Sequence, residues 1–176
     1  MLILGFKPYH LFECFTVHGV PHMEIFKEAI ISQYNRLSGV KRFNRADCDK
    51  WLAGYDVSAF PMPIHTIQTK QSNSAQCLVE IPSYMGMDVM EAYVEDPNVK
   101  FILTERKPEK WAASVNKTAA QVVKSGEEFP INILKHFDPF LNIFIRINQL
   151  VYSAMASCTR PGDPDNEEML CKYYTE

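Results

Sequence analysis

One stretch of the chain, residues 101–114, constrains the fold and the chemistry more than any other. Its first residues are apolar and run into Arg106, and Pro108 then suits the first turn of a helix. Ser114 follows Arg106 by eight positions. A guanidinium at the end of a strand, followed by a helix that carries a hydroxyl, is an arrangement suited to phosphate. The stretch therefore predicts a strand, a helix and an anion site where they meet.

The other segments alternate between strand and helix patterns. Residues 77–80 and 99–104 are predicted as short strands, and apolar residues at helical spacing predict helices over 20–37, 107–124 and 140–157. This alternation favours a parallel α/β sheet covered by helices. With 176 residues, of which 47% are hydrophobic, the chain is long enough for a single domain over residues 1–176 with a real core.

Charge and cysteine content narrow the classes of function. The formal net charge of −3 does not indicate a protein that binds nucleic acid or an anionic membrane through a broad positively charged surface. The apolar segment 140–156 contains Asn142 and Arg146 among other polar residues, so we expect an amphipathic helix and no membrane span. Five dispersed cysteines without a Cys-x-x-Cys pair, and no evident signal peptide, favour a cytoplasmic protein with reduced thiols.

Residues 58–76 do not follow the alternating pattern. They are mostly polar, include Pro61 and Pro63, and show neither a helical nor a strand period. A stretch of this length without secondary structure is unusual inside a compact α/β unit. We therefore predict that it is an inserted loop or a translated intron.

Several segments, taken in order, resemble a known family. They are Tyr9-His10 and the ranges 51–56, 78–83, 100–106 and 111–115. Together they resemble the sulfotransferases that use 3′-phosphoadenosine 5′-phosphosulfate, most closely the sulfotransferase-like P-loop branch that is abundant in fungi. The resemblance implies an α/β fold with a three-layer parallel sheet of the P-loop NTPase/sulfotransferase type, here incomplete at both ends.

The resemblance also implies roles for four residues. Arg106 and Ser114 match the family's pair that binds the 3′-phosphate of the nucleotide, where charge-assisted hydrogen bonds suit a dianion. Glu80 matches a position at which the family places a catalytic histidine or acid, and His10 would line the acceptor pocket. The implied reaction transfers a sulfuryl group from 3′-phosphoadenosine 5′-phosphosulfate to a small hydroxylated acceptor, with no metal ion.

One part of the family pattern has no counterpart here. The family begins with a strand and a Gly-rich loop that cradles the 5′-phosphosulfate, whereas the seven glycines of this chain form no such loop. The missing loop favours, as an alternative, a non-catalytic nucleotide-binding or interaction remnant of the fold. Loss of the first strand would also expose apolar surface, which a homodimer would cover.

Two further hypotheses remain open from the residues alone. His10, Cys14, His18 and His22 recur every four residues, which on one helix would align zinc-type ligands, although a glycine and a proline interrupt that helix. A small-molecule kinase would also use a P-loop sheet, but no P-loop lysine occurs. Metal analysis, and the preference for ATP or adenosine 3′,5′-bisphosphate, would separate both from a sulfotransferase.

Overall fold

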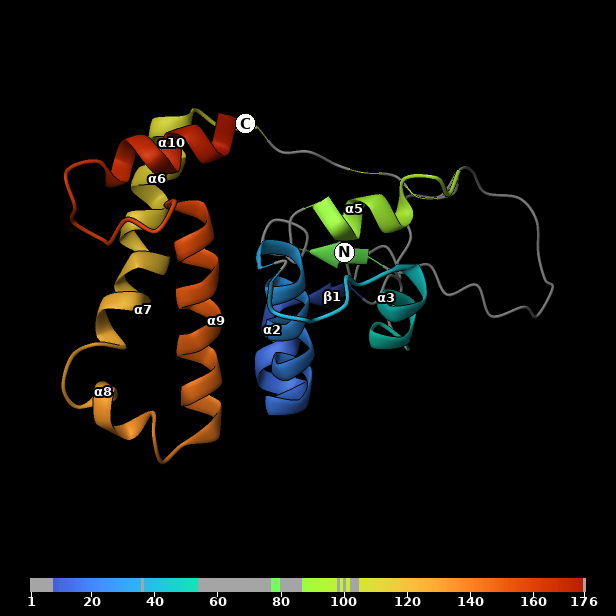
Figure 1. Ribbon diagram of the computed structural model, residues 1–176, viewed down its shortest axis with the longest axis horizontal. Helices are drawn as coiled ribbons and strands as arrows, with labels where there is room; N and C mark the ends of the chain where they lie inside the picture. The colour runs from blue at the N-terminus through green and yellow to red at the C-terminus, as the bar shows by residue number, and fades with distance from the viewer. Residues whose placement is uncertain are drawn as a thin grey trace.

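The computed structural model describes residues 8–35, 37–53, 77–79, 87–97, 99, 101 and 105–175. Within them the chain forms two groups of helices, which meet where α2 (Val20–Tyr34) packs along α9 (Pro139–Met155) (Figure 1). The remaining elements are, in chain order, β1 (Pro8–His10), α1 (Leu11–Glu13), the π-helix η2 (Cys14–His18), α3 (Arg45–Trp51), β2 (Cys77–Val79), α5 (Met87–Tyr93), α6 (Pro108–Lys117), α7 (Ala119–Ser125), α8 (Ile131–Leu134) and α10 (Asn166–Thr175).

The prediction of a three-layer parallel sheet is wrong for the part of the chain that the structure describes. The described sheet consists of β1 and β2, three residues each, paired in parallel with His10 opposite Val79. Val99 and Phe101, predicted within a longer strand, lie in no strand. Most described residues are helical, because the apolar faces of the helices cover one another instead of a central sheet. The predicted insertion at 58–76 lies outside the described residues.

The first group of helices packs around α2. Met23 and Phe26 are fully buried, as their spacing predicts, and the Phe26 ring lies 6.0 Å from the ring of Trp51 on α3. The helix ends at Tyr34, three residues earlier than predicted. Leu37 was expected on the buried face and is instead 98% exposed, because it lies beyond the end of the helix.

Polar contacts fix the start of α3 and join it to α5. The Asn44 side chain accepts a hydrogen bond from the Asp47 amide at 3.1 Å, and the Asp47 carboxylate accepts one from the Asn44 amide at 3.0 Å. Arg45 forms an ion pair with Asp96, just after α5, at 2.6 Å. Its guanidinium also lies 4.9 Å from the centre of the Tyr93 ring. These contacts hold α3 and α5 against each other beside α2.

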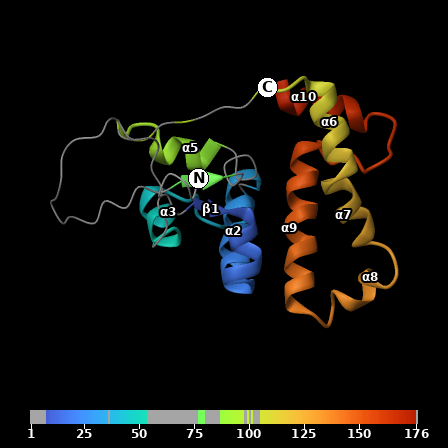
Figure 2. The same ribbon diagram turned by 180° about the vertical axis from the view of Figure 1, so that it is seen from behind.

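The second group is a bundle of helices from α6 to α10, seen from both sides in Figures 1 and 2. In it α7 packs along α9, and α10 packs across α6. The helix predicted over 107–124 is broken at Thr118, which separates α6 from α7. The Thr118 hydroxyl donates a hydrogen bond to the Ser114 carbonyl at 2.8 Å. At the break, this side chain therefore competes with backbone amides for a carbonyl acceptor.

The amphipathic helix predicted over 140–157 is confirmed as α9. Its Asp138 N-cap accepts hydrogen bonds from the amides of Phe140 and Leu141 at 2.9 and 3.2 Å. Ile147 and Val151 are buried against the rest of the core. Among the described helices, none combines the length and the hydrophobicity that crossing a membrane requires.

Candidate functional site

The predicted phosphate-binding pair lies on α6 and the residues just before it. Arg106 is exposed and comes two residues before Pro108, where α6 begins. Ser114 is half-buried within α6. Because seven residues make almost two full turns, Ser114 lies on the same side of the helix as Lys107, about 10 Å further along its axis. The pair thus places a positive charge just before the helix and a hydroxyl nearly two turns along it.

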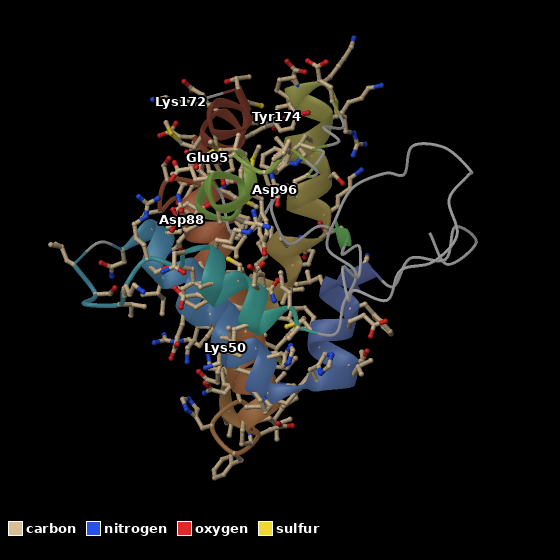
Figure 3. The ribbon with its side chains drawn as sticks, turned by 90° about the vertical axis from the view of Figure 1, so that its right-hand side faces the viewer. Lys50, Asp88, Glu95, Asp96, Lys172 and Tyr174 are labelled. Atoms are coloured by element: carbon tan, nitrogen blue, oxygen red, sulfur yellow. The ribbon has the colours of Figure 1, made fainter. Side chains whose placement is uncertain are left out.

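The C-terminal helix α10 holds the Arg106 segment in place. The Arg106 amide donates a hydrogen bond to the Tyr174 hydroxyl at 2.7 Å. The Tyr174 ring lies 5.1 Å from the ring of Trp111 on α6, with 34° between the ring planes. Figure 3 shows Tyr174 at the place where α10 and α6 lie side by side. One side chain of α10 therefore contacts both Arg106, two residues before α6, and Trp111 in the first turn of that helix.

The neighbouring tyrosine makes a different connection. The Tyr173 hydroxyl lies 2.9 Å from the hydroxyl of Tyr34 at the end of α2. Burial, followed by this hydrogen bond, raises the pKa of Tyr34 well above its usual range. The Tyr173 ring also stacks on Trp111 at 6.2 Å. Tyr173 thus links α10 to the first group of helices, whereas Tyr174 faces the start of α6.

Sequence reasoning did not identify these aromatic residues. The only signals available were a tryptophan three residues before Ser114 and a pair of tyrosines near residue 174. Neither pattern indicates a site by itself, because aromatic residues at helical spacing are commonly core residues. Their proximity to Arg106 became evident only when the fold brought α10 against α6.

The two residues predicted to take part in the transfer step are His10 and Glu80. His10 is the last residue of β1, and its Nδ1 accepts a hydrogen bond from the Phe12 amide at 3.0 Å, which caps α1. Glu80 lies outside the described residues. Val79, which pairs with His10 across the sheet, directly precedes Glu80 in the sequence. The roles of His10 and Glu80 stay predictions.

The zinc hypothesis gains no support from the described residues. Cys14 is completely buried, and the series passes from a π-helix through Gly19, with φ of 61°, into α2. The series of residues at four-residue spacing therefore does not lie on one continuous helix, because it is interrupted between His18 and His22. Across the described ranges, no group of three or more histidine, cysteine, aspartate or glutamate side chains is arranged to hold a metal ion.

Two hollows on the described surface lie away from Arg106 and Ser114. One, of about 260 Å³, lies between Val20 on α2 and the start of α9 near Pro139. The other, of about 360 Å³, lies between α7, α9 and the turn that contains Arg160. Neither is lined by a residue of the predicted pair, so neither hollow is the predicted phosphate site.

A family model described as a sulfotransferase domain matches residues 1–176, the whole of the sequence. No curated protein and no solved structure matches the chain significantly.

Proposed function

The chain belongs to the sulfotransferase domain family, and from this premise we propose that it transfers a sulfuryl group from 3′-phosphoadenosine 5′-phosphosulfate to a small hydroxylated acceptor. The family supports sulfotransferase-like chemistry. The nucleotide donor and the class of acceptor are the parts that the proposal adds. A small-molecule kinase or a zinc protein is not favoured by any of the described contacts.

The observation that carries the proposal is the placement of Arg106 and Ser114. Arg106 is exposed just before α6, and Ser114 is half-buried within that helix, nearly two turns beyond the N-cap Lys107. In this position the guanidinium supplies a permanent positive charge, and the hydroxyl supplies a directional donor. Such a pair is suited to a phosphate monoester, and we assign to it the 3′-phosphate of the nucleotide.

In the proposed reaction the acceptor oxygen attacks sulfur in line with the bond to the leaving phosphate. A new oxygen–sulfur bond forms as the bond between sulfur and the 5′-phosphate oxygen breaks, and adenosine 3′,5′-bisphosphate leaves. The acceptor proton passes to the Glu80 carboxylate. Arg106 and Ser114 do not touch the reacting atoms in this scheme, and they contribute by holding the nucleotide in position.

Calorimetry with adenosine 3′,5′-bisphosphate tests the binding part of the proposal. Replacing Arg106 with alanine should weaken the affinity at least about tenfold, because a hydrogen bond to a charged group is worth about 1.5–3 kcal/mol. Ser114→Ala should weaken it by a smaller factor. Arg146→Ala is the matched control, since Arg146 is an exposed arginine on α9. Equal affinity in the wild type and in R106A would remove the pair from the nucleotide site.

A transfer assay with a simple phenol and 3′-phosphoadenosine 5′-phosphosulfate tests the chemical part. Formation of a sulfated phenol that is lost in Glu80→Gln is the expected result. Binding of the bisphosphate without transfer would instead favour a non-catalytic nucleotide-binding protein. Tighter binding of ATP than of the bisphosphate would contradict the assignment of Arg106 and Ser114.

A further inference from the structure

Few hydrogen bonds from the helix itself hold the start of α6 in place. Lys107, the N-cap residue, makes no side-chain capping hydrogen bond. Arg106 lies outside the helix, so helical hydrogen bonds do not fix its backbone. Among the described residues, the contact that does fix it is the hydrogen bond from its amide to the Tyr174 hydroxyl at 2.7 Å.

The orientation of this backbone matters for an anion site. A long arginine side chain loses rotamer freedom when it binds, and a backbone that already points it correctly reduces this cost. Tyr174 is itself secured, because its ring packs against Trp111 within α6. The same tyrosine therefore sets the position of Arg106 relative to the helix that carries Ser114.

We propose that Tyr174 is a positioning residue that makes the site selective for a 3′-phosphorylated nucleotide. This inference rests on the proposed function, because it assumes that Arg106 and Ser114 bind the 3′-phosphate. By holding the Arg106 amide, the Tyr174 hydroxyl fixes the backbone position from which the guanidinium and the Ser114 hydroxyl would bind the same phosphate. Its removal leaves the charge of Arg106 unchanged and alters only its placement.

The adjacent residue provides a matched control. Tyr173 lies on the same helix and also contacts Trp111, yet its hydroxyl bonds to Tyr34 and not to Arg106. Tyr173→Phe and Tyr174→Phe each delete one hydroxyl and keep the ring. If the effect on nucleotide binding came from a general loosening of α10, the two variants would behave alike.

The experiment compares two nucleotides in the full chain. Calorimetry gives the affinities for adenosine 3′,5′-bisphosphate and for adenosine 5′-monophosphate, and their ratio measures the preference for the 3′-phosphate. Tyr174→Phe should lower this ratio about three- to tenfold, which corresponds to one ordinary hydrogen bond. The affinity for the monophosphate should not change, and Tyr173→Phe should keep the wild-type ratio.

Other outcomes overturn the inference in distinguishable ways. Equal loss of affinity for both nucleotides in Tyr174→Phe, or a parallel effect in Tyr173→Phe, would make the role structural. An unchanged ratio would show that the hydroxyl does not position Arg106. A wild-type chain without any preference for the bisphosphate would overturn the 3′-phosphate site itself, and this inference with it.

A measurement on the wild-type chain does not depend on how the variants fold. Amide hydrogen exchange should be slower at Arg106 than in an unstructured peptide, because its amide is hydrogen-bonded to Tyr174. Fast exchange at Arg106 would contradict the contact on which the inference depends.

Discussion

The imidazole rings of His18 and His22 stack with 3.9 Å between their centres and 14° between their planes. His18 ends η2 and His22 lies in the first turn of α2, with Gly19 between the two helices. Burial, and then the proximity of His18, lowers the pKa of His22 below its ordinary value of 6.5. A positive charge on His22 is therefore disfavoured first by its burial and then by the neighbouring His18 ring.

This stack predicts a pH-dependent stability. In the unfolded chain His22 takes up a proton near pH 6.5, whereas in the folded chain it does so only at a lower pH. His22 should therefore have no effect on the free energy of unfolding well above pH 6.5. The free energy of unfolding should decrease as the pH falls from 6.5 toward the lower folded-state pKa. Urea unfolding at about pH 7.5 and about pH 5.5 measures the difference.

The two histidines can be tested separately. His22→Gln should reduce the loss of stability between the two pH values, because the group with the lowered pKa is removed. His18→Gln should have a smaller effect, since burial is the larger cause of the shift at His22. An identical pH dependence in the wild type and in H22Q would contradict the prediction.

Gly126 marks a close approach between the end of α7 and α9. A Cβ built on Gly126 would lie 2.5 Å from Cγ2 of Ile145, closer than carbon atoms can pack. The backbone of Gly126 is in the right-handed helical region, so an alanine would be strained by steric contacts and not by its backbone conformation. The new Cβ would also lie 3.3 Å from Cδ1 of Ile145 and from the Val123 carbonyl oxygen. Gly126→Ala should therefore lower the free energy of unfolding by about 1–3 kcal/mol.

A second variant separates this steric effect from others. Ile145→Ala makes room for the new methyl group, so G126A should cost less in that background than in the wild type. Ser125→Ala, one residue earlier, is the control for a change of side chain at the end of α7. Urea unfolding curves give the free energies for the wild type, the two single variants, the double variant and the control. Strict additivity of G126A and I145A would contradict the predicted contact.

A buried polar cluster joins α10 to α9. The Tyr152 hydroxyl lies 2.8 Å from the amide nitrogen of Asn166 and 3.0 Å from its amide oxygen, and the Asn166 amide also donates to Thr159 at 3.1 Å. Asn166→Leu should cost about 1–3 kcal/mol in the free energy of unfolding, because it leaves buried polar atoms with fewer partners.

A double-mutant cycle that combines Asn166→Leu with Tyr152→Phe measures the part of this free-energy cost that comes from the interaction between the two side chains. When both polar groups are absent, the double variant should be less destabilised than the sum of the single variants. Thermal unfolding followed by circular dichroism is sufficient. If the loss of stability in the double variant equals the sum of the two single losses, the two side chains do not stabilise each other.

The sequence predicted helices better than it predicted the sheet. The spacing of Met23 and Phe26 correctly indicated the buried face of α2, because helical periodicity is a local property. The strand expected at 99–104 rested on a short apolar run, which does not distinguish a strand from an irregular segment. Val99 and Phe101 show the consequence, since neither lies in a strand.

The candidate site was predictable only in part. Arg106 and Ser114 are close in sequence, so their placement beside one helix followed from local structure. Tyr174 lies 68 positions from Arg106. No pattern in the sequence indicates a hydrogen bond across that separation, because it depends on how α10 packs against α6.

The packing of α2 on α9 has a consequence for how the chain is made. About a hundred residues separate the end of α2 from the start of α9. At a synthesis rate of about 5–20 residues per second, α2 waits roughly 5–20 seconds for its partner helix. During that interval α2 lacks the cover that α9 provides. We expect α2 to be the segment of the nascent chain that a holding chaperone binds.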